Sequence, residues 1–335
     1  MAASWRRVNR PEIRPYDPRM SPEVTIVIPT RNRWELLAAT ALPSALGQAE
    51  VDHEIVVVDE GSTDGTAAGL ASIGDPRLRV VRHDQARGVA QARNAGIAAA
   101  GGAWVAFLDD DDVWSPEKLR RQIDAGAEAS FVYSAAAWLD ARRRYQRTLS
   151  PPGADGLAAR LLSWNEIWAG GSNVIARTDL LAQLGGFDER LFQLADWDLW
   201  IRLALAAPAA AVDDVLVGYV QQPQSMLLTD RRDVFAEFHY LVEKHREASA
   251  RLGARPDAAK FARWVAFGHL RAGRRRRAAA TYLRAVRHGD AASALRAVVA
   301  LGGERYFGLA RDLRRAGIPR AEAGRPPWLA RYEAR

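Results

Sequence analysis

AWVAFLDDDDVWSPEKL, residues 103–119, is the stretch that decides the fold, because an apolar run ends there in four consecutive aspartates. The apolar part predicts a strand buried in a sheet, since parallel strands covered on both faces read as continuous hydrophobic runs. Asp109 to Asp112 repel one another, and each like-charge pair at contact distance costs about 1 kcal/mol in water and more near a protein surface. The cluster therefore needs a compensating role.

Three similar apolar runs precede this strand: EVTIVIP (23–29), HEIVVVD (53–59) and RLRVVRH (77–83). Segments with a helical pattern lie between and after the runs, at 34–46, 64–73, 88–100 and 116–129. The last of them has Ser115 as its predicted N-cap and Pro116 at its first helical position. This alternation predicts an α/β fold with a mostly parallel sheet.

Each of the four predicted strands ends in polar residues. They are Thr30-Arg31-Asn32, Asp59-Glu60-Gly61-Ser62, His83-Asp84 and the four aspartates. In open α/β sheets, ligands bind beyond the carboxyl ends of the strands. We therefore expect side chains that are far apart in the sequence to meet at one edge of the sheet.

The second half of the chain is less regular. It predicts a hairpin (130–140 with 143–149), a strand (171–178), a short helix (180–184), an amphipathic helix (196–207) and a last strand (211–220). From Asp230 onward the pattern is helical and strongly basic, and 261–289 has the rhythm of a single tetratricopeptide-like hairpin. We predict a mobile arm over 1–22, an α/β domain over 23–228 and a basic helical domain over 229–335.

Composition limits the class of protein. The chain has 335 residues, of which 48% are hydrophobic and 26% charged, and it carries a formal net charge of +7. The absence of cysteine excludes disulfides, thiolate nucleophiles and cysteine-ligated metal centres. The N-terminal segment has no signal-peptide core, and no apolar run approaches the roughly 18 residues of a membrane span. We expect a cytoplasmic protein, with peripheral membrane contact left open.

Three readings of the aspartate cluster are open: a solvated acidic turn, a calcium loop, or a site that grips a divalent ion carrying a phosphorylated ligand. A calcium loop of the EF-hand type requires alternating ligands and a central glycine, which DDDDVWSPEKLR lacks. An isolated cluster would favour the acidic turn. The divalent-ion site is favoured because two further polar segments are expected at the same ligand edge, VVVDEGSTDGT (56–66) and RGVAQARNAG (87–96).

Five blocks then carry a resemblance, in order and spacing: VTIVIPTRNR (24–33), IVVVDEGSTDGT (55–66), the stretch from RGVAQARNAG to DVWSPEKL (87–119), GGFDERL (185–191) and ADWDLWIRL (195–203). Together they resemble glycosyltransferase family 2, whose members are inverting, use sugar nucleotides and have a GT-A fold. The resemblance covers about residues 23–220 and leaves the basic tail open. It implies a GT-A-type α/β domain followed by a small helical domain.

The resemblance assigns the aspartates at the end of the fourth strand. The cluster is similar to the family's D-x-D motif, which implies that Asp109 and Asp111 lie at the nucleotide ribose and at Mg²⁺ or Mn²⁺, with Asp111 the direct ligand. Asp110 occupies the variable position and counts as a nucleotide-sugar-binding residue, unless it only caps the next turn. Asp112 has the same structural alternative. A bound divalent ion would offset the repulsion between the carboxylates.

Other blocks imply further nucleotide-sugar contacts. Asp59-Glu60 resembles the acidic pair that reads the base and ribose, although the common pattern there is Asp-Asp. The segment Pro29-Thr30-Arg31 is similar to the part of the family's first strand that lies along the nucleotide. Arg93 looks like the arginine on the diphosphate side, with a helix-surface charge as the alternative.

ADWDLWIRL resembles the block that holds the general base, which implies that role for Asp196. Inversion needs a carboxylate opposite the leaving diphosphate, where it can take the acceptor proton. Ala195 stands where the family often has Glu. Asp198 is interpreted as a helix-start carboxylate that favours the helix dipole. Trp197 and Trp200 are interpreted as packing residues, while Trp164 and Trp168 fit either the acceptor side or the core.

The sequence therefore predicts a metal-dependent inverting glycosyltransferase that uses a nucleotide diphosphate sugar. UDP is favoured as the nucleotide, with dTDP and GDP as alternatives. The acceptor is left open between a glycan, a lipid-linked saccharide, a peptide and a small molecule, and no nucleic acid is expected. Two other hypotheses are a binding or scaffold protein without turnover, suggested by Glu60 and Ala195, and a nucleotidyltransferase, whose glycine-rich loop is absent after the first strand.

Overall fold

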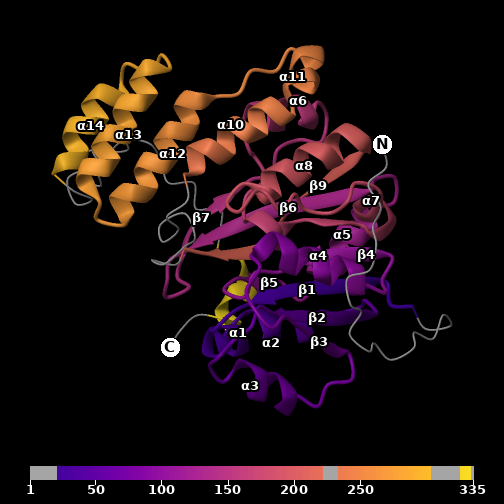
Figure 1. Cartoon of the computed structure of the whole chain (residues 1–335). Helices are drawn as coiled ribbons and strands as arrows, with labels where there is room; N and C mark the ends of the chain where they lie inside the picture. The colour runs from indigo at the N-terminus through magenta and orange to yellow at the C-terminus, as the bar shows by residue number, and fades with distance from the viewer. Residues whose placement is uncertain (1–20, 222–232, 303–324, 333–335) are drawn as a thin grey trace.

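A computed structural model describes residues 21–221, 233–302 and 325–332 of the chain. A nine-stranded mixed sheet lies at its centre, in the order β3-β2-β1-β4-β8-β6-β9-β5 with β7 paired to β6 (Figure 1). The strands are β1 (Val24–Thr30), β2 (His53–Asp59), β3 (Leu78–Arg82), β4 (Trp104–Phe107), β5 (Val113–Trp114), β6 (Phe131–Leu139), β7 (Tyr145–Leu149), β8 (Ile175–Arg177) and β9 (Ala209–Val220).

The four predicted strands of the first half are confirmed as the parallel part of the sheet, in which β1 pairs with β2 and β4, and β2 pairs with β3. Their apolar residues face two core layers. On β1, Ile26 and Ile28 pack into one layer and Val27 into the other. Strands buried on both faces explain the continuous hydrophobic runs in the sequence.

The remaining strands make the sheet mixed. β8 is antiparallel to β4 and β6, β5 is antiparallel to β9, and β6 is parallel to β9. The predicted hairpin is confirmed as β6 and β7. The strand predicted over 171–178 is wrong in its first half, because 170–173 forms a 3₁₀ turn and only β8 is extended. The two-residue strand β5 was not predicted.

Helices cover both faces of the sheet, and a helical unit follows it (Figure 1). They are α1 (Trp34–Ala39), α2 (Ala41–Leu46), α3 (Thr66–Ser72), α4 (Val89–Ala99), α5 (Lys118–Ala125), α6 (Leu157–Ser163), α7 (Thr178–Gln183), α8 (Ala195–Ala206), α10 (Val234–Lys244), α11 (Arg246–Leu252), α12 (Ala258–Arg271), α13 (Arg275–Arg287) and α14 (Ser293–Leu301), with 3₁₀ turns η1 (Gly170–Asn173) and η2 (Pro327–Arg331).

The single helix predicted over 34–46 is wrong, because the chain breaks at Thr40 into α1 and α2. Pro43 has no N–H to donate to the carbonyl of Ala39, four residues earlier. Arg143 donates to that carbonyl instead, at 3.0 Å. The predicted start of the helix over 116–129 is also wrong, because the N–H of Ser115 continues the strand pairing of β5 by donating to Leu216 O, so α5 starts at Lys118.

The helical C-terminal region shares its core with the sheet. Val234, Phe238 and Phe261 belong to the same apolar cluster as Trp197 and the β4 residue Phe107. The predicted hairpin over 261–289 is confirmed as α12 and α13, which form a second, smaller cluster with α14. Most of the predicted arm and the boundary at 228/229 lie outside the described residues. Within the described ranges, no helix is long and apolar enough to cross a membrane.

Candidate active site

The four aspartates after β4 divide into two inward-facing and two more exposed carboxylates. Asp110 accepts a hydrogen bond from Thr30 Oγ1 at 2.9 Å and pairs with Arg33 Nη1 at 2.5 Å. Asp112 is 0% exposed and accepts from the N–H of Val220 at 2.8 Å and from a serine of η1. By contrast, the side chains of Asp109 and Asp111 are 30% and 19% exposed. The repulsion is thus relieved by turning alternate carboxylates into the protein.

The serine that binds Asp112 belongs to the GGSN segment of η1. Ser172 Oγ donates to Asp112 at 2.6 Å and accepts from the N–H of Asp109 at 3.0 Å, while its carbonyl accepts from Trp114 Nε1. One residue of η1 therefore fixes both ends of the aspartate cluster. The role of Ser172 was not predicted, because it depends on a contact between segments about 60 residues apart.

Arg93 of α4 lies beside the exposed end of the cluster. Its Nη2 donates to Asp109 Oδ1 at 2.5 Å, and its guanidinium lies 5.2 Å from the ring centre of Phe187. A Cβ on Gly171 would come within 2.7 Å of Arg93 Nη2, so the glycine leaves room for the arginine. Arg93 is buried, and its Nε has no hydrogen-bond partner among the described residues. The alternative of a solvated surface charge is wrong.

Asp196 lies in the first turn of α8 and completes this group. Its Oδ1 accepts from the N–H of Trp197 at 2.7 Å, and a Cβ on Gly170 would lie 3.2 Å from its Oδ2. Burial raises the pKa of Asp196 above its ordinary value, while the charge of Arg93 opposes that rise. The carboxyl is only partly exposed. Asp109, Arg93 and Asp196 thus come together from β4, α4 and α8.

Asp59 and Glu60 lie at the end of β2 and hold the neighbouring loops. Asp59 is fully buried, pairs with Arg82 and accepts from the N–H of Ser62 at 2.9 Å. Glu60 accepts from His83 Nδ1 at 2.5 Å and from the N–H groups of Arg87 and Gly88 at 2.9 and 2.6 Å. These bonds connect the end of β2 to the loop before α4. A role of either carboxylate at the base stays a prediction.

The first-strand segment contributes an arginine contact that was not predicted. Pro29 and Thr30 are buried at the end of β1, and Arg31 is exposed, so a place for this segment along the nucleotide stays a prediction. Arg33 contacts the aspartates, with Nη1 2.5 Å from Asp110 and Nη2 3.4 Å from Asp111. The second arginine of IPTRNR (28–33) is Arg33, and it was the feature of the sequence that could have identified this contact. It was missed because strand alternation does not extend past the end of β1.

The two partly exposed carboxylates, Asp109 and Asp111, suit a divalent cation. Burial, followed by the charge of Asp110, raises the pKa of Asp111 to about 7, so its ionised form lacks sufficient positive charge nearby. Carboxylate oxygens are the ligands that Mg²⁺ and Mn²⁺ prefer. No group of three or more His, Asp or Glu side chains suited to a metal occurs among the described residues. Asp111 and Asp109 therefore fit an ion that is also held by substrate phosphates and water, as Mg²⁺ usually is.

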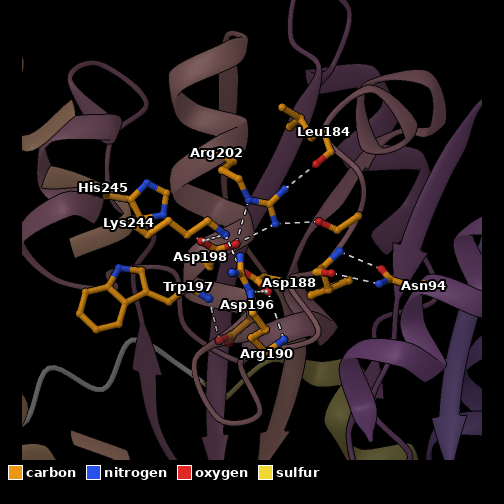
Figure 2. A network of polar contacts seen from close by, with 12 residues as sticks. Asn94, Leu184, Asp188, Arg190, Asp196, Trp197, Asp198, Arg202, Lys244 and His245 are labelled. Atoms are coloured by element: carbon orange, nitrogen blue, oxygen red, sulfur yellow. Dashed lines mark hydrogen bonds and ion pairs between the residues drawn. The ribbon is translucent and has the colours of Figure 1, made fainter. Parts of the chain in front are cut away.

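Asp198 lies two residues from Asp196 but in a different environment, as Figure 2 shows. Its side chain is 0% exposed and lies 2.8 Å from Arg202 Nη2, 2.7 Å from Lys244 Nζ and 2.8 Å from His245 Nε2. Burial would raise the pKa of Asp198, but the hydrogen bond from His245 and the charges of Arg202 and Lys244 lower it below the ordinary value. Asp198 is confirmed as a carboxylate in the first turn of α8, and in addition it joins α8 to α10 and to the start of α11.

Glu237 of α10 holds the loop that leads into Asp196. Its Oε2 accepts from the backbone N–H groups of Phe192, Gln193 and Leu194 at 3.0, 2.8 and 3.2 Å. These N–H groups precede α8, where no side-chain N-cap is present. Glu237 was not predicted, because it lies more than 40 residues away and outside the blocks that carry the resemblance.

The tryptophans near the site mainly pack. Trp197 and Trp200 are buried as expected. Trp164 stacks edge-to-face with Trp197 at 5.6 Å, and Lys260 lies 4.9 Å from its ring centre, so its packing role is supported. Trp168 packs at the margin of the other core layer.

Solved structures show which fold the chain has. The chain aligns with S. aureus TarS 1–349 in complex with UDP-GlcNAc at a TM-score of 0.51 and 18% identity, over 89% of this chain and 93% of that one. It aligns with the mannosyltransferase PcManGT from Pyrobaculum calidifontis in complex with GDP-Man and Mn²⁺ at a TM-score of 0.50 and 21% identity, over 94% and 84%. The predicted GT-A glycosyltransferase fold is confirmed.

Part of the chain matches a known family. Residues 25–185, slightly less than half of the chain, match the family described as glycosyl transferase family 2. The chain is 44% identical over 125 residues to the succinoglycan biosynthesis protein ExoO of Rhizobium meliloti, covering 36% of each chain. It is 35% identical over 112 residues to the UDP-Glc:alpha-D-GlcNAc-diphosphoundecaprenol beta-1,3-glucosyltransferase WfgD of Escherichia coli, covering 33% of this chain and 44% of that protein. The chain thus matches less than half the length of these relatives.

Proposed function

We propose that the protein is a metal-dependent inverting glycosyltransferase that moves a sugar from a nucleotide diphosphate, with UDP favoured, to an acceptor hydroxyl. The observation that carries the proposal is the meeting of Asp109, Arg93 and Asp196 at the carboxyl edge of the sheet. The match of residues 25–185 to glycosyl transferase family 2 supports it. So do the UDP-sugar named for the relative WfgD and the UDP-GlcNAc bound to TarS.

The proposed reaction uses Asp196 as the general base. The acceptor oxygen attacks C1 of the sugar from the face opposite the diphosphate, and its proton passes to a carboxylate oxygen of Asp196. The bond between C1 and the diphosphate oxygen breaks, and its electron pair leaves with the diphosphate. Arg93, held in place by Asp109 and Phe187, provides positive charge on the side where negative charge develops.

Asp111 and Asp109 are the proposed ligands of Mg²⁺ or Mn²⁺. The bound ion would neutralise the donor diphosphate and the leaving group. Arg33 keeps Asp110 turned away from this position, and Asp110 is thereby proposed to shape the nucleotide side of the site rather than to ligate. The Mn²⁺ named with PcManGT supports the choice of ion.

A lipid-linked saccharide is our proposed acceptor class, supported by the diphosphoundecaprenol substrate in the name of WfgD. This acceptor implies work at a membrane surface, where we propose that the protein acts as a peripheral cytoplasmic enzyme. No nucleic-acid partner is proposed.

The experiment compares Asp196→Asn with wild type. We expect UDP release from UDP-glucose and UDP-GlcNAc, with Mn²⁺ and a panel of saccharide acceptors, to fall at least about a hundredfold, because a general base contributes about that much. Donor affinity measured by calorimetry should stay unchanged, since only a transition-state interaction is removed. The exposed Asp213→Asn is the matched control. Full turnover in Asp196→Asn would show that Asp196 is not the general base. Donor binding without turnover in the wild-type protein would favour a binding protein over an enzyme.

A further inference from the structure

An open groove of about 1570 Å³ lies between the start of α10, α12 and α13. Its lining includes Gln193, which is three residues before the proposed base Asp196. The backbone of Gln193 is held by Glu237 of α10. The groove therefore connects the C-terminal helices to the loop that carries the catalytic carboxylate.

The groove is strongly basic. Six arginines line it: Arg274, Arg275, Arg276, Arg277, Arg284 and Arg287. Among the described residues none of them forms an ion pair with a carboxylate, and the lining carboxylate Asp233 is engaged as the N-cap of α10. Four of the arginines lie at the N-terminus of α13, where the helix dipole is also positive and no acidic side chain lies in the first turn. This concentration of charge is unfavourable within the chain, and a bound anion would relieve it.

Two residues that line the same groove each have a buried polar atom without a hydrogen-bond partner among the described residues. Gln193 Oε1 and His269 Nδ1 have no hydrogen-bond partner in the described part of the chain. A carbonyl oxygen such as Gln193 Oε1 accepts a hydrogen bond from a hydroxyl, whereas an imidazole N–H donates to a phosphate oxygen. Buried polar groups are normally paired, so each unpaired atom is a candidate contact for a group of a ligand that enters the groove. A ligand that carries both a hydroxyl and an anionic group could pair with both atoms.

The distances favour an acceptor in this groove. Three residues span at most about 10 Å, so a sugar at Gln193 lies within one or two sugar units of Asp196. The wall also includes Leu283, which is 50% exposed, and neighbouring α14 presents Leu295 and Val298, which are 57% and 66% exposed among the described residues. The groove and its margin thus offer contacts for a hydroxyl, an anion and an apolar chain.

We propose that this groove holds the acceptor, and that the acceptor is a glycosyl diphosphate carried on a lipid. Its sugar contacts Gln193, its diphosphate lies among Arg274 to Arg277 and His269, and its lipid leaves along Leu283. This inference rests on the proposed transferase function and adds the site at which the acceptor is recognised. The arginines bind the acceptor anion and take no part in donor binding.

The test measures binding of decyl diphosphate by calorimetry to the full chain, with UDP and Mn²⁺ saturating so that the donor site is occupied. Arg275→Glu/Arg276→Glu should weaken binding at least about tenfold, because charge-assisted contacts to phosphate are replaced by repulsion. Arg251→Glu/Arg255→Glu makes the same change in net charge on exposed residues outside the groove and should change affinity less than about twofold. The affinity for UDP should be the same in all three proteins.

Three results would overturn the inference. Equal weakening in both double variants would mean that only net charge matters. Equally tight binding of decyl maltoside would mean that the diphosphate is not recognised. If poly(A) bound more tightly than decyl diphosphate and lost this binding in Arg275→Glu/Arg276→Glu, the ligand of the groove would be an extended phosphodiester polymer and not a lipid diphosphate. Failure of wild type to bind UDP would instead count against the proposed transferase, since that measurement does not involve the groove.

Discussion

At the scale of single residues, the four aspartates illustrate how one repulsive cluster serves two purposes. Asp110 and Asp112 are satisfied by contacts with Thr30, Arg33, Ser172 and the Val220 N–H, and they shape the loop. This leaves Asp109 and Asp111 to face outward. The four aspartates form a turn after β4, closed by a hydrogen bond of 3.1 Å from the N–H of Asp112 to the carbonyl of Asp109, and the turn directs Asp110 and Asp112 to these partners.

Asp111→Asn should abolish metal-dependent turnover without unfolding the protein. The amide removes a charged ligand, and it also relieves repulsion from Asp110, so thermal stability without metal should hold or rise. Thermal unfolding with UDP, with and without Mn²⁺, checks this, because a ligand that binds only the folded state raises the melting temperature. Asp213→Asn controls for the loss of one charge. Undiminished activity in EDTA would contradict the metal assignment.

At the scale of elements, α8 presents two carboxylates to opposite environments. Residues two apart on a helix point about 200° from one another, so Asp196 faces Arg93 while Asp198 faces inward to Arg202 and Lys244. The network in Figure 2 continues through Asp188, which accepts from Lys244 Nζ and Tyr240 Oη at 2.7 and 2.8 Å. Helix α8 therefore carries the proposed base on one side and, on the other side, the ion-paired Asp198 that anchors the helix to its neighbours.

Asp198→Asn should destabilise the fold by about 3–5 kcal/mol, because it leaves buried cations without their partner. Asp196→Asn, two residues away, should leave stability unchanged or higher, since burial disfavours its ionised form. Chemical denaturation at pH 7 compares the two. Equal stability of both variants would contradict the assignment of Asp198 as the structural carboxylate.

The cost of Asp198→Asn should depend on pH. The pKa of Asp198 is lower in the folded protein than its ordinary value of 3.8, so its contribution to stability is present above pH 3.8 and is lost as pH falls through the folded pKa. Asparagine does not titrate. The difference in unfolding free energy between wild type and Asp198→Asn should therefore be constant at neutral pH and shrink below about pH 3.8. A difference that grows in acid would contradict the ion-pair network.

Glu237→Gln should reduce kcat while leaving donor affinity unchanged. The amide oxygen still accepts hydrogen bonds but lacks the charge that holds three N–H groups before Asp196, so the base is less firmly positioned. We expect a loss of about tenfold in kcat, with UDP binding by calorimetry as the second readout. Glu243→Gln on the same helix, with a 73% exposed side chain, is the control. An unchanged kcat would restrict Glu237 to a role in stability.

At the scale of the whole molecule, the helical region completes the core of the sheet domain. Phe238 and Phe261 stack with ring centres 4.1 Å apart, and both pack against Trp197 of α8. Glu237 and the Asp198 network add polar contacts across the same junction. The helices that line the arginine groove are thereby fixed relative to the proposed base.

A chain truncated after residue 228 should lose most of its stability and with it UDP binding, because Trp197 and its neighbours would be exposed. Phe261→Ala in the full chain tests the same junction and should cost about 3–5 kcal/mol. The exposed Leu252→Ala should change stability by less than about 0.5 kcal/mol. Thermal unfolding reports all three. A truncated chain that unfolds cooperatively at the wild-type temperature would show that the two regions are independent.

The sequence by itself predicted the four parallel strands of the first half and the edge where their polar end residues meet, because apolar runs, helical periods and strand-end residues are local patterns. The role of Asp196 came from the resemblance to glycosyltransferase family 2. Only the tertiary structure decided which carboxylates are available. Asp112 is satisfied by Val220, 108 residues away, and Asp198 by His245, 47 residues away. Burial and pairing depend on such distant contacts, which no local spacing records. For the same reason only the tertiary structure shows that the arginines of α13 line one groove together with Gln193, three residues before Asp196.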